Sequence, residues 1–447
     1  MKRQAESKLK AWQSRPSRKP LLLRGVRQCG KTYLLRDIFG ASFPHCHYFD
    51  LEKDARAASV FARGSLEPKR LLAELELVAD TSIDPTRDLI LLDEIQASPR
   101  ALTSLKYFCD DLPGSFVCAA GSLVGVTTSE GPFPVGKVEF LDLNPMNFGE
   151  FLHAAGEHRM LQALMDAKCS GPLPDSAHQR LWELLGDYLV VGGMPEAVAA
   201  FLDIGRQGPR EAFLEARRIQ EGLIQGYLAD MAKYSGRQNS MHIERIWRNL
   251  PAQLGREVDG NAPRYRFKGV IPGRKGYRGL EGPIGWLERA RLVLRCALVD
   301  RAEPPVSAWA KPGRFKLYAH DIGILGAVAG IRILDRGGFR EGFYKGWVAE
   351  SLVAQEMVSA GNRDLYSWKR NTAEVEFLHV LDEGVCPVEV KAGNREHSKS
   401  AGVFASRNQS PVVFKLGSWN YHRRGRTCFL PLYAAVFLPN LDSVSSI

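Results

Sequence analysis

Residues 25–32 read GVRQCGKT, and residues 88–94 read DLILLDE. The first stretch fits the pattern G-x4-G-K-[ST] at every position. It follows an apolar run at 21–23 and precedes a helix-like run at 33–39, which is the strand–loop–helix context in which the pattern marks a phosphate-binding loop. Glycines at 25 and 30 let the loop aim its N–H groups at phosphate oxygens, and the helix that begins near Lys31 adds its positive dipole end.

Each residue of this loop has an expected role in binding a nucleotide. Lys31 is placed to reach the β- and γ-phosphates, and Thr32 to supply a hydroxyl to Mg²⁺. The predicted nucleotide-binding residues are Gly25, Val26, Arg27, Gln28, Cys29, Gly30, Lys31, Thr32 and Tyr33.

The second stretch supports the first. Its continuous apolar run, 89–92, is typical of a strand buried on both faces of a parallel sheet. Asp93 at the end of this strand is placed to hold Mg²⁺ through water, and Glu94 to polarise the attacking water as a general base does. Alone, an acidic pair could be a solvated strand end, but beside the phosphate loop it predicts a nucleoside triphosphatase.

Size and composition narrow the class of protein. A chain of 447 residues is expected to form two to four domains. Its 45% hydrophobic and 25% charged content is ordinary for a soluble protein, and it contains no apolar run long enough to span a bilayer. The N-terminus lacks the apolar core of a secretory signal, and the cysteines are scattered without CxxC pairs. We therefore expect a cytoplasmic protein with reduced thiols and no membrane partner.

Positive charge is concentrated in two regions. The net charge is +10, yet residues 1–40 hold eleven Lys or Arg against two acids, and residues 233–316 hold eighteen against seven. This polarity suggests basic patches. The second patch alternates basic and aromatic residues at 263–268 (PRYRFK), so DNA or RNA contact through 236–316 and simple solvated faces both remain open.

The N-terminal third has a βα pattern. Strand-like runs at 20–24, 46–51, 89–92, 115–120 and 137–143 alternate with helix-like stretches. This alternation predicts an α/β domain with a parallel, doubly wound sheet over residues 1–150.

Several motifs resemble a widespread bacterial and archaeal group of AAA+-type ATPases. The resemblance lies in GVRQCGKT, in LILLDEIQ (89–96), in AAGS (119–122) and in LDLNPMNFGEFL (141–152). It continues through YLVVGGMPEA (188–197), IERIWRNLPAQL (243–254) and FKLYAHDIGILG (315–326), and covers roughly residues 10–440.

The resemblance implies ATP and Mg²⁺ as the cofactors of a P-loop NTPase core. It implies that Ser122, at the tip of the strand beside the Asp93 strand, senses the γ-phosphate, although Gly-Ser is also a common turn pair. Two positions depart from the group: its TGSS is AAGS here, and its Gly-Arg is Gly136-Lys137. The second departure leaves the arginine finger unassigned, with Arg100 a loose candidate, and a homo-oligomer possible in principle.

Two modules are expected after the core. Residues 151–235 are rich in Leu, Ala and Glu and predict a helical lid. Residues 236–335 resemble a winged helix, with an amphipathic helix at 241–254 and a second helix running into a strand at 283–295. Such a module can place a helix in the major groove of DNA, or it can dock a protein partner, and the sequence leaves both open.

Residues 336–447 predict a separate α/β domain. Two strand-like runs at 373–380 and 386–393 carry a pattern that resembles the PD-(D/E)xK nuclease core, after a helix-like run at 344–357. Two carboxylates and a lysine can bind Mg²⁺ and activate water, whereas Glu and Lys on an edge strand are also ordinary solubility features. The residues of this nuclease-like site are Glu350, Glu376, Glu389 and Lys391.

The sequence thus predicts a Mg²⁺-dependent AAA+-type ATPase whose nucleotide state moves a basic winged-helix-like module and a nuclease-like domain on nucleic acid. Two alternatives remain. One is a nuclease that ATP switches, and the other is a slow ATPase that docks a protein partner as a regulator or scaffold.

Overall fold

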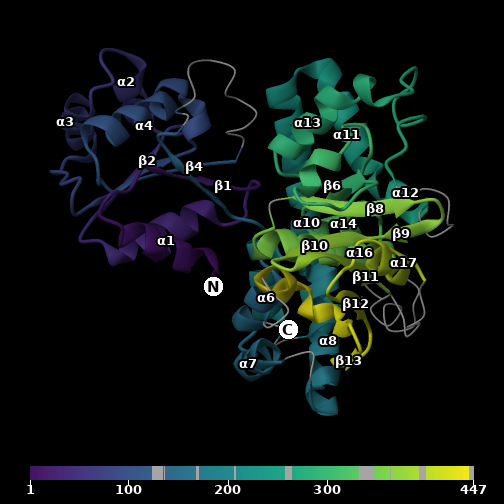
Figure 1. The fold of residues 1–447 in the computed structure, drawn as a ribbon. Coiled ribbons are helices and arrows are strands. Elements are labelled where there is room, and N and C mark those ends of the chain that lie inside the picture. Colours follow the sequence, from purple (N-terminus) through teal and green to yellow (C-terminus); the bar gives the residue numbers. More distant parts are fainter. Residues whose placement is uncertain are drawn as a thin grey trace. The chain divides into compact units, whose positions relative to one another are not determined.

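The computed structural model describes residues 1–122, 134, 136–167, 171–205, 208–256, 264–331, 346–362, 364–391 and 399–441. The chain forms two compact units (Figure 1). One comprises Lys2–Asn144 with Arg289–Arg291, and the other comprises Pro145–Glu288 and Leu292–Ile447.

The N-terminal unit is built on a five-stranded parallel sheet in the order β2-β3-β4-β1-β5. Its strands are β1 (Leu21–Arg24), β2 (Cys46–Asp50), β3 (Leu89–Asp93), β4 (Val117–Gly121) and β5 (Glu139–Asp142). This confirms the parallel α/β sheet predicted from the βα pattern.

Helices cover both faces of this sheet (Figure 1). Helices α2 (Ala55–Ala62), α3 (Pro68–Ala79) and α4 (Pro99–Asp111) share one core with the strands, whose members include Phe61, Leu71, Ile90 and Leu105. On the opposite face, α1 (Ala5–Gln13) places Trp12 edge-on to Phe39 of η1 (Tyr33–Phe39), a helix with wide π-type turns. Apolar residues on both faces of the strands therefore explain the doubly wound arrangement.

The second unit opens with a helical stretch. It contains α6 (Phe148–Ala154), α7 (His158–Asp166), α8 (Asp175–Val191), α9 (Pro195–Ile204) and α10 (Pro209–Ser235). A capping box between Asn147 and Glu150 begins α6. Contacts tie this stretch to the C-terminal part of the chain: His178 Nδ1 of α8 lies 2.7 Å from Tyr433 Oη, and Leu173 N, just before α8, donates to Asn420 Oδ1 at 3.0 Å.

The segment expected to resemble a winged helix contains helices and an antiparallel pair of strands, and this pair belongs to a larger sheet. Helices α11 (Arg237–Arg248), α12 (Leu250–Gly255) and α13 (Glu281–Arg289) precede the antiparallel strands β6 (Val293–Val299) and β7 (Phe315–Ala319). Strand β6 also pairs in parallel with β8 (Leu365–Arg370), which pairs with β9 (Ala373–Val375). The expected boundary at 335/336 lies outside the described residues, yet this sheet continues across it.

A second five-stranded sheet completes the unit. Its order is β10-β11-β12-β14-β13, with β11, β12 and β14 parallel and the edge strands antiparallel. The strands are β10 (Phe377–Leu381), β11 (Gly384–Val390), β12 (Val413–Gly417), β13 (His422–Arg424) and β14 (Thr427–Pro431). The remaining helices of this part are α14 (Ile322–Val328), α16 (Trp347–Ala360), α17 (Ser400–Arg407) and η8 (Leu432–Asn440).

A buried polar node joins distant parts of this second unit. Phe148 N donates to Glu356 Oε2 at 3.0 Å, and Tyr188 Oη lies 2.9 Å from Glu356 Oε1. Gly193 N donates to Asp321 Oδ2 at 2.6 Å. A Cβ added at Gly193 would lie 2.0 Å from Met146 O, so this position has no room for a side chain.

Within the described part of the chain, no helix is long and apolar enough to cross a membrane.

Candidate functional site

The loop between β1 and η1 has the backbone shape that phosphate binding requires. Gly30 has φ +92° and Gln28 has φ +62°, so the loop turns through the left-handed region twice. A Cβ added at Gly25 would meet Leu143 O at 2.3 Å. The sequence therefore needs glycine at 25 because of a close backbone approach, and the helix that follows begins at Lys31.

Lys31 lies across the loop. Its side chain is buried, and Nζ donates to the carbonyl oxygens of Gly25 at 3.0 Å and Val26 at 2.9 Å. The two carbonyls thus hold the ammonium within the loop. A phosphate oxygen bound there would give the ammonium a charged acceptor, which makes a stronger hydrogen bond than a neutral carbonyl. Arg27 and Tyr33 are exposed, the latter at 49%, while Cys29 is buried.

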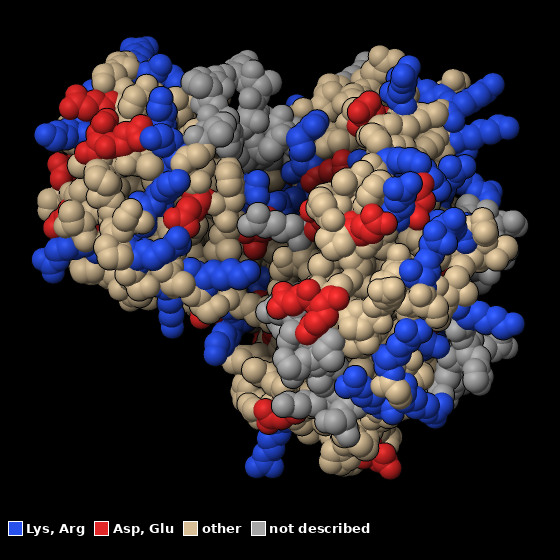
Figure 2. All heavy atoms as spheres, in the orientation of Figure 1, with Lys and Arg blue, Asp and Glu red and all other residues tan. Residues whose placement is uncertain are grey.

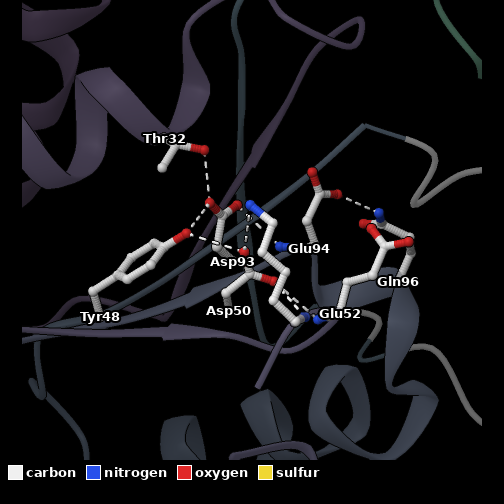
Figure 3. Close-up of polar contacts among 8 residues, drawn as sticks. Thr32, Tyr48, Asp50, Glu52, Asp93, Glu94 and Gln96 are labelled. Carbon is white, nitrogen blue, oxygen red and sulfur yellow. Dashed lines mark hydrogen bonds and ion pairs between the residues drawn. The ribbon is translucent and has the colours of Figure 1, made fainter. Parts of the chain in front are cut away.

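Thr32 and Asp93 meet, as the two motifs predict (Figure 3). Thr32 Oγ1 donates to Asp93 Oδ2 at 2.6 Å, and Tyr48 Oη donates to the same oxygen at 3.2 Å. Asp93 is only 3% exposed, and Glu94 N donates to its other oxygen, Oδ1, at 2.9 Å. A hydroxyl beside a carboxylate is an oxygen donor set of the kind that Mg²⁺ prefers, so these residues fit the metal.

Glu94 adopts a left-handed backbone conformation, φ +46°, directly after the strand. Burial raises the pKa of its carboxyl, while the hydrogen bond from Gln96 and the charge of Lys31 oppose the rise. The Gln96 amide donates to the Glu94 carboxylate and orients it (Figure 3). A carboxylate with a raised pKa is a better proton acceptor, as expected of a group that activates water.

Ser122 follows β4, the strand between β1 and β3. Gly121 is the register partner of Arg24, so Ser122 stands one residue beyond, level with Gly25. Its side chain is 8% exposed. The topology therefore brings Ser122 to the same sheet edge as the loop and Glu94.

Arg100, the loose candidate for an arginine finger, and Lys137 are both engaged away from the loop. The guanidinium of Arg100 donates to Phe61 O at 2.7 Å and Gly64 O at 2.6 Å. Lys137, at the position where the resembled group has the Arg of Gly-Arg, pairs with Asp110 at 2.6 Å. The Arg100 side chain therefore binds main-chain carbonyls, and the Lys137 side chain binds a carboxylate, of the N-terminal unit.

Sequence reasoning assigned no role to Arg3, which braces the loop. Arg3 Nη1 donates to Cys29 O at 3.1 Å, and Nη2 donates to Asn144 O at 2.6 Å. Gln96 and Tyr48 were also given no role. Gln96 sits within the quoted motif LILLDEIQ and could have been noticed there, whereas no spacing pattern marks Arg3 or Tyr48.

The four residues of the predicted nuclease-like site converge. Lys391 Nζ lies 2.9 Å from Glu389 Oε1 and 3.8 Å from Glu376 Oε1. Lys415, which sequence reasoning missed, lies 3.6 Å from Glu389 Oε2. Burial raises the pKa of Glu376, with Lys391 opposing the rise and the Glu350 charge adding to it.

Glu350 from α16 borders the same cluster. Lys316 Nζ on β7 lies 3.2 Å from Glu350 Oε2 and 3.3 Å from Glu374 Oε1, and Tyr318 donates to Glu350 at 3.0 Å. We name Lys316, Glu350, Glu374, Glu376, Glu389, Lys391 and Lys415 the carboxylate–lysine centre.

The fit of this centre to Mg²⁺ rests on two oxygens. Glu376 Oε2 and Glu389 Oε2 are buried without a hydrogen-bond partner, although the Lys415 ammonium lies 3.6 Å from the second oxygen. Among the described residues, no group of three Asp, Glu, His or Cys side chains could hold a metal. Two carboxylates with water and substrate phosphate are nonetheless a usual Mg²⁺ environment, so a weak, substrate-completed site fits.

In the basic module, the alternation of basic and aromatic residues has a packing explanation. Tyr265 is 3% exposed and packs against Phe315 and Phe267, while Arg264 and Arg266 are exposed. The alternation of basic and aromatic residues is thus an inward–outward alternation. Helix α13, which precedes the hairpin, exposes Glu281 and Gly282 with Arg289 and so presents little positive charge to a groove; its other positions are at least half-buried.

Comparisons with family models match three segments of the chain. An AAA domain matches residues 17–152. A domain of unknown function (DUF8612) matches residues 183–335, and another (DUF4143) matches residues 345–435. A search of curated proteins finds no match. The AAA match supports an AAA-type ATPase in the N-terminal unit, in agreement with the loop geometry and the sheet.

Proposed function

We propose that this protein binds and hydrolyses ATP with Mg²⁺ in its N-terminal unit. The observation that carries the proposal is the 2.6 Å contact of Thr32 with Asp93, placed directly beside a glycine loop that holds Lys31. A phosphate loop alone is a local motif. Its meeting with an acidic strand end 61 residues later in the sequence brings the phosphate-binding, metal-binding and water-activating groups of phosphoryl transfer together.

Each residue then has a defined task. The N–H groups of residues 25–32 and the Lys31 ammonium bind the phosphates, while Thr32 and Asp93 hold the metal. Mg²⁺ bound there would neutralise charge on the β- and γ-phosphates. Glu94, oriented by Gln96, accepts the proton of the attacking water. Ser122 contacts the γ-phosphate from the neighbouring strand.

The test is the steady-state rate of phosphate release from ATP. Lys31→Ala and Glu94→Gln are expected to lower kcat by about 100-fold or more, because each removes a group that acts on the transferring phosphate or the water. Lys137→Ala and Glu74→Gln are matched controls on exposed ion pairs of the same unit. Their rates are expected to stay within about twofold of the wild type, since exposed pairs contribute little to stability. Full turnover in both site variants would refute the assignment.

A route for coupling to the second unit follows the chain itself. Asn144 O accepts a hydrogen bond from the same Arg3 that braces the P-loop at Cys29. Four residues later, Phe148 N donates to Glu356 in the buried polar node. We infer that nucleotide-dependent movement of the loop passes along 144–148. Stimulation of the ATPase by single-stranded or duplex nucleic acid, with Glu94→Gln as the blank, tests this coupling.

The carboxylate–lysine centre supports a second activity, Mg²⁺-dependent cleavage of a phosphodiester. The two unsatisfied oxygens of Glu376 and Glu389 would hold the metal, and Lys391 would stabilise charge at the attacked phosphate. Glu350 is engaged by Lys316 and Tyr318 and would orient the cluster.

Nicking of a supercoiled plasmid in Mg²⁺ tests this second activity. We expect nicking to fall at least tenfold in Lys391→Ala and in Glu389→Gln. Lys31→Ala, which removes the ATP-binding lysine, should lose the response of nicking to ATP. Lys369→Ala is the matched control, because Lys369 contacts Glu374 at 3.7 Å and neither unsatisfied carboxylate. Equal nicking by wild type and Lys391→Ala would assign the activity to a contaminant.

A further inference from the structure

A surface pocket lies where the loop after β6, the end of β8 and the end of α17 meet. Its volume is about 670 Å³, within the range of sites that hold a nucleotide-sized ligand. All its lining residues belong to the second unit. Four cationic side chains, Arg301, Lys311, Arg370 and Arg407, face two carboxylates, Asp300 and Glu303.

The positive charge of this pocket is only partly compensated. Lys311 Nζ lies 2.9 Å from Asp300 Oδ2, which neutralises that carboxylate. Among the described residues, no ion pair forms at Arg370 or Arg407, and both side chains are exposed. Figure 2 shows Lys and Arg gathering over the part of this unit where Figure 1 labels β8, β9 and α17. An anion would therefore meet two uncompensated guanidinium groups here.

The pocket also contains a fixed aromatic platform. Trp309 Nε1 donates to Glu303 O at 2.9 Å, and the indole packs against a core cluster that includes Val306 and Phe404. The guanidinium of Arg301 lies over the indole, 4.7 Å from the ring centroid. A guanidinium held over an indole is a flat, cationic surface on which a nucleobase can stack.

This pocket is distinct from the carboxylate–lysine centre. Strand β8 contributes Lys369 to the border of that centre, where it contacts Glu374, and Arg370 to the pocket. Successive residues of a strand point to opposite faces of the sheet. The two sites therefore use opposite faces of the sheet formed by β6–β9.

We propose that the pocket binds one nucleotide unit of a single-stranded nucleic acid, with the base on the Arg301–Trp309 stack and phosphates on Arg370 and Arg407. Stacking platforms combined with cationic side chains are how proteins bind single strands. A duplex buries its bases within its own stack and cannot use the platform. The proposal depends neither on ATP hydrolysis nor on phosphodiester cleavage.

Fluorescence anisotropy of labelled dT and rU strands of about twelve nucleotides, with the full chain and a duplex of equal length, tests the proposal. Arg370→Ala/Arg407→Ala is expected to weaken single-strand binding at least tenfold. The double variant should also make the plot of log binding constant against log salt concentration less steep by about 1.4, measured between about 0.05 and 0.15 M salt. This is the change expected when two phosphate contacts to a single strand are lost. Arg159→Ala/Arg210→Ala, on exposed arginines of α7 and α10, is the matched control.

The stack has its own pair of variants. Trp309→Leu is expected to weaken binding about fivefold or more, and Trp309→Phe to retain most of it, with melting by circular dichroism confirming that each variant folds. If the control double variant lost as much affinity, the effect would come from the overall charge of the protein, and the proposed site would be overturned. If the protein bound the duplex as tightly as the single strand, the proposed stacking of a base on the Arg301–Trp309 pair would be overturned. Displacement of the strand by AMP at a comparable molar concentration would assign the pocket to a free nucleotide instead.

Discussion

Arg3 shows how one residue far from a motif can set its geometry. Its guanidinium bridges Cys29 O in the P-loop and Asn144 O at the end of the sheet unit. Both acceptors are main-chain carbonyls, so Arg3 acts on the shape of the loop, whereas Lys31 is the residue proposed to bind the phosphates. Arg3 is therefore a positioning residue, and its loss should appear in nucleotide affinity more than in the chemical step.

We expect Arg3→Ala to raise the KM for ATP about tenfold with kcat changed less than threefold. Removing a charged donor from two carbonyls costs about 1.5 kcal/mol or more for each hydrogen bond, part of which the loop recovers by relaxing. Initial rates over a range of ATP concentrations separate the two constants. Lys2→Ala, at the exposed neighbouring position, is the control. A fall in kcat with KM unchanged would contradict the positioning role.

At the scale of elements, the buried polar node ties α6, α8 and α16 into one unit. Tyr188 Oη lies 2.6 Å from Met146 O and 2.9 Å from Glu356 Oε1 but has one hydrogen to share. Burial raises the pKa of Glu356 to about 8, with the hydrogen bond from Phe148 opposing the rise. A protonated Glu356 donates to Tyr188 and leaves the tyrosine hydrogen for Met146, so every contact becomes a hydrogen bond.

The node therefore predicts a pH-dependent stability. Folded Glu356 keeps a proton up to a pKa of about 8, whereas the unfolded chain releases it near 4.5. Stability is thus fully present below pH 4.5 and is lost as the pH rises to about 8. Glu356→Gln mimics the protonated form, so we expect it to remove this slope and to raise the Tm at pH 9 on the order of 5 °C.

Thermal melting between pH 5 and pH 9 measures this effect, with Glu221→Gln on the exposed face of α10 as the control. The Tm of Glu356→Gln at pH 5 should match the wild type, since the amide reproduces the donor and the acceptor of the protonated acid. A Tm that falls equally with pH in both proteins would show that Glu356 is charged in the folded state.

At the scale of the whole molecule, the chain divides into two compact units, so a ligand that binds one unit is expected to raise the thermal stability of that unit alone. A ligand that binds only the folded N-terminal unit stabilises that unit by about 2.7 kcal/mol at 100 times its Kd. For a domain of about 150 residues this corresponds to a shift of about 8 °C. We expect calorimetry with Mg²⁺ and a non-hydrolysable ATP analogue to raise one transition and leave the other in place.

Lys31→Ala should abolish that shift without moving either transition of the free protein by more than a few degrees. Equal movement of both transitions would mean that the units unfold as one cooperative body. A shift that persists in Lys31→Ala would place the nucleotide outside the P-loop.

The sequence by itself determined the P-loop, the acidic strand end and the five strands of the first sheet. These are local patterns: glycine spacing, apolar runs and strand–helix alternation act through neighbours in the chain. The five strands lie close to where the sequence predicted them, and the roles of the loop and of the acidic strand end stay predictions. The proximity of Glu376, Glu389 and Lys391 was also expected from their spacing. The expected run at 373–380 is broken at Glu376, between β9 and β10, which belong to different sheets. The role of these residues and of Glu350 in a nuclease-like site stays a prediction.

Only the tertiary structure decided what surrounds these groups. Arg3 reaches Asn144 across 141 residues, and Lys316 and Lys415 reach the carboxylates from other strands. The aromatic residues beside Arg264 and Arg266 face inward, and the Trp309 pocket unites three separate segments. Such contacts join residues that no periodicity relates, because burial and pairing depend on how sheets and helices pack and not on spacing along the chain.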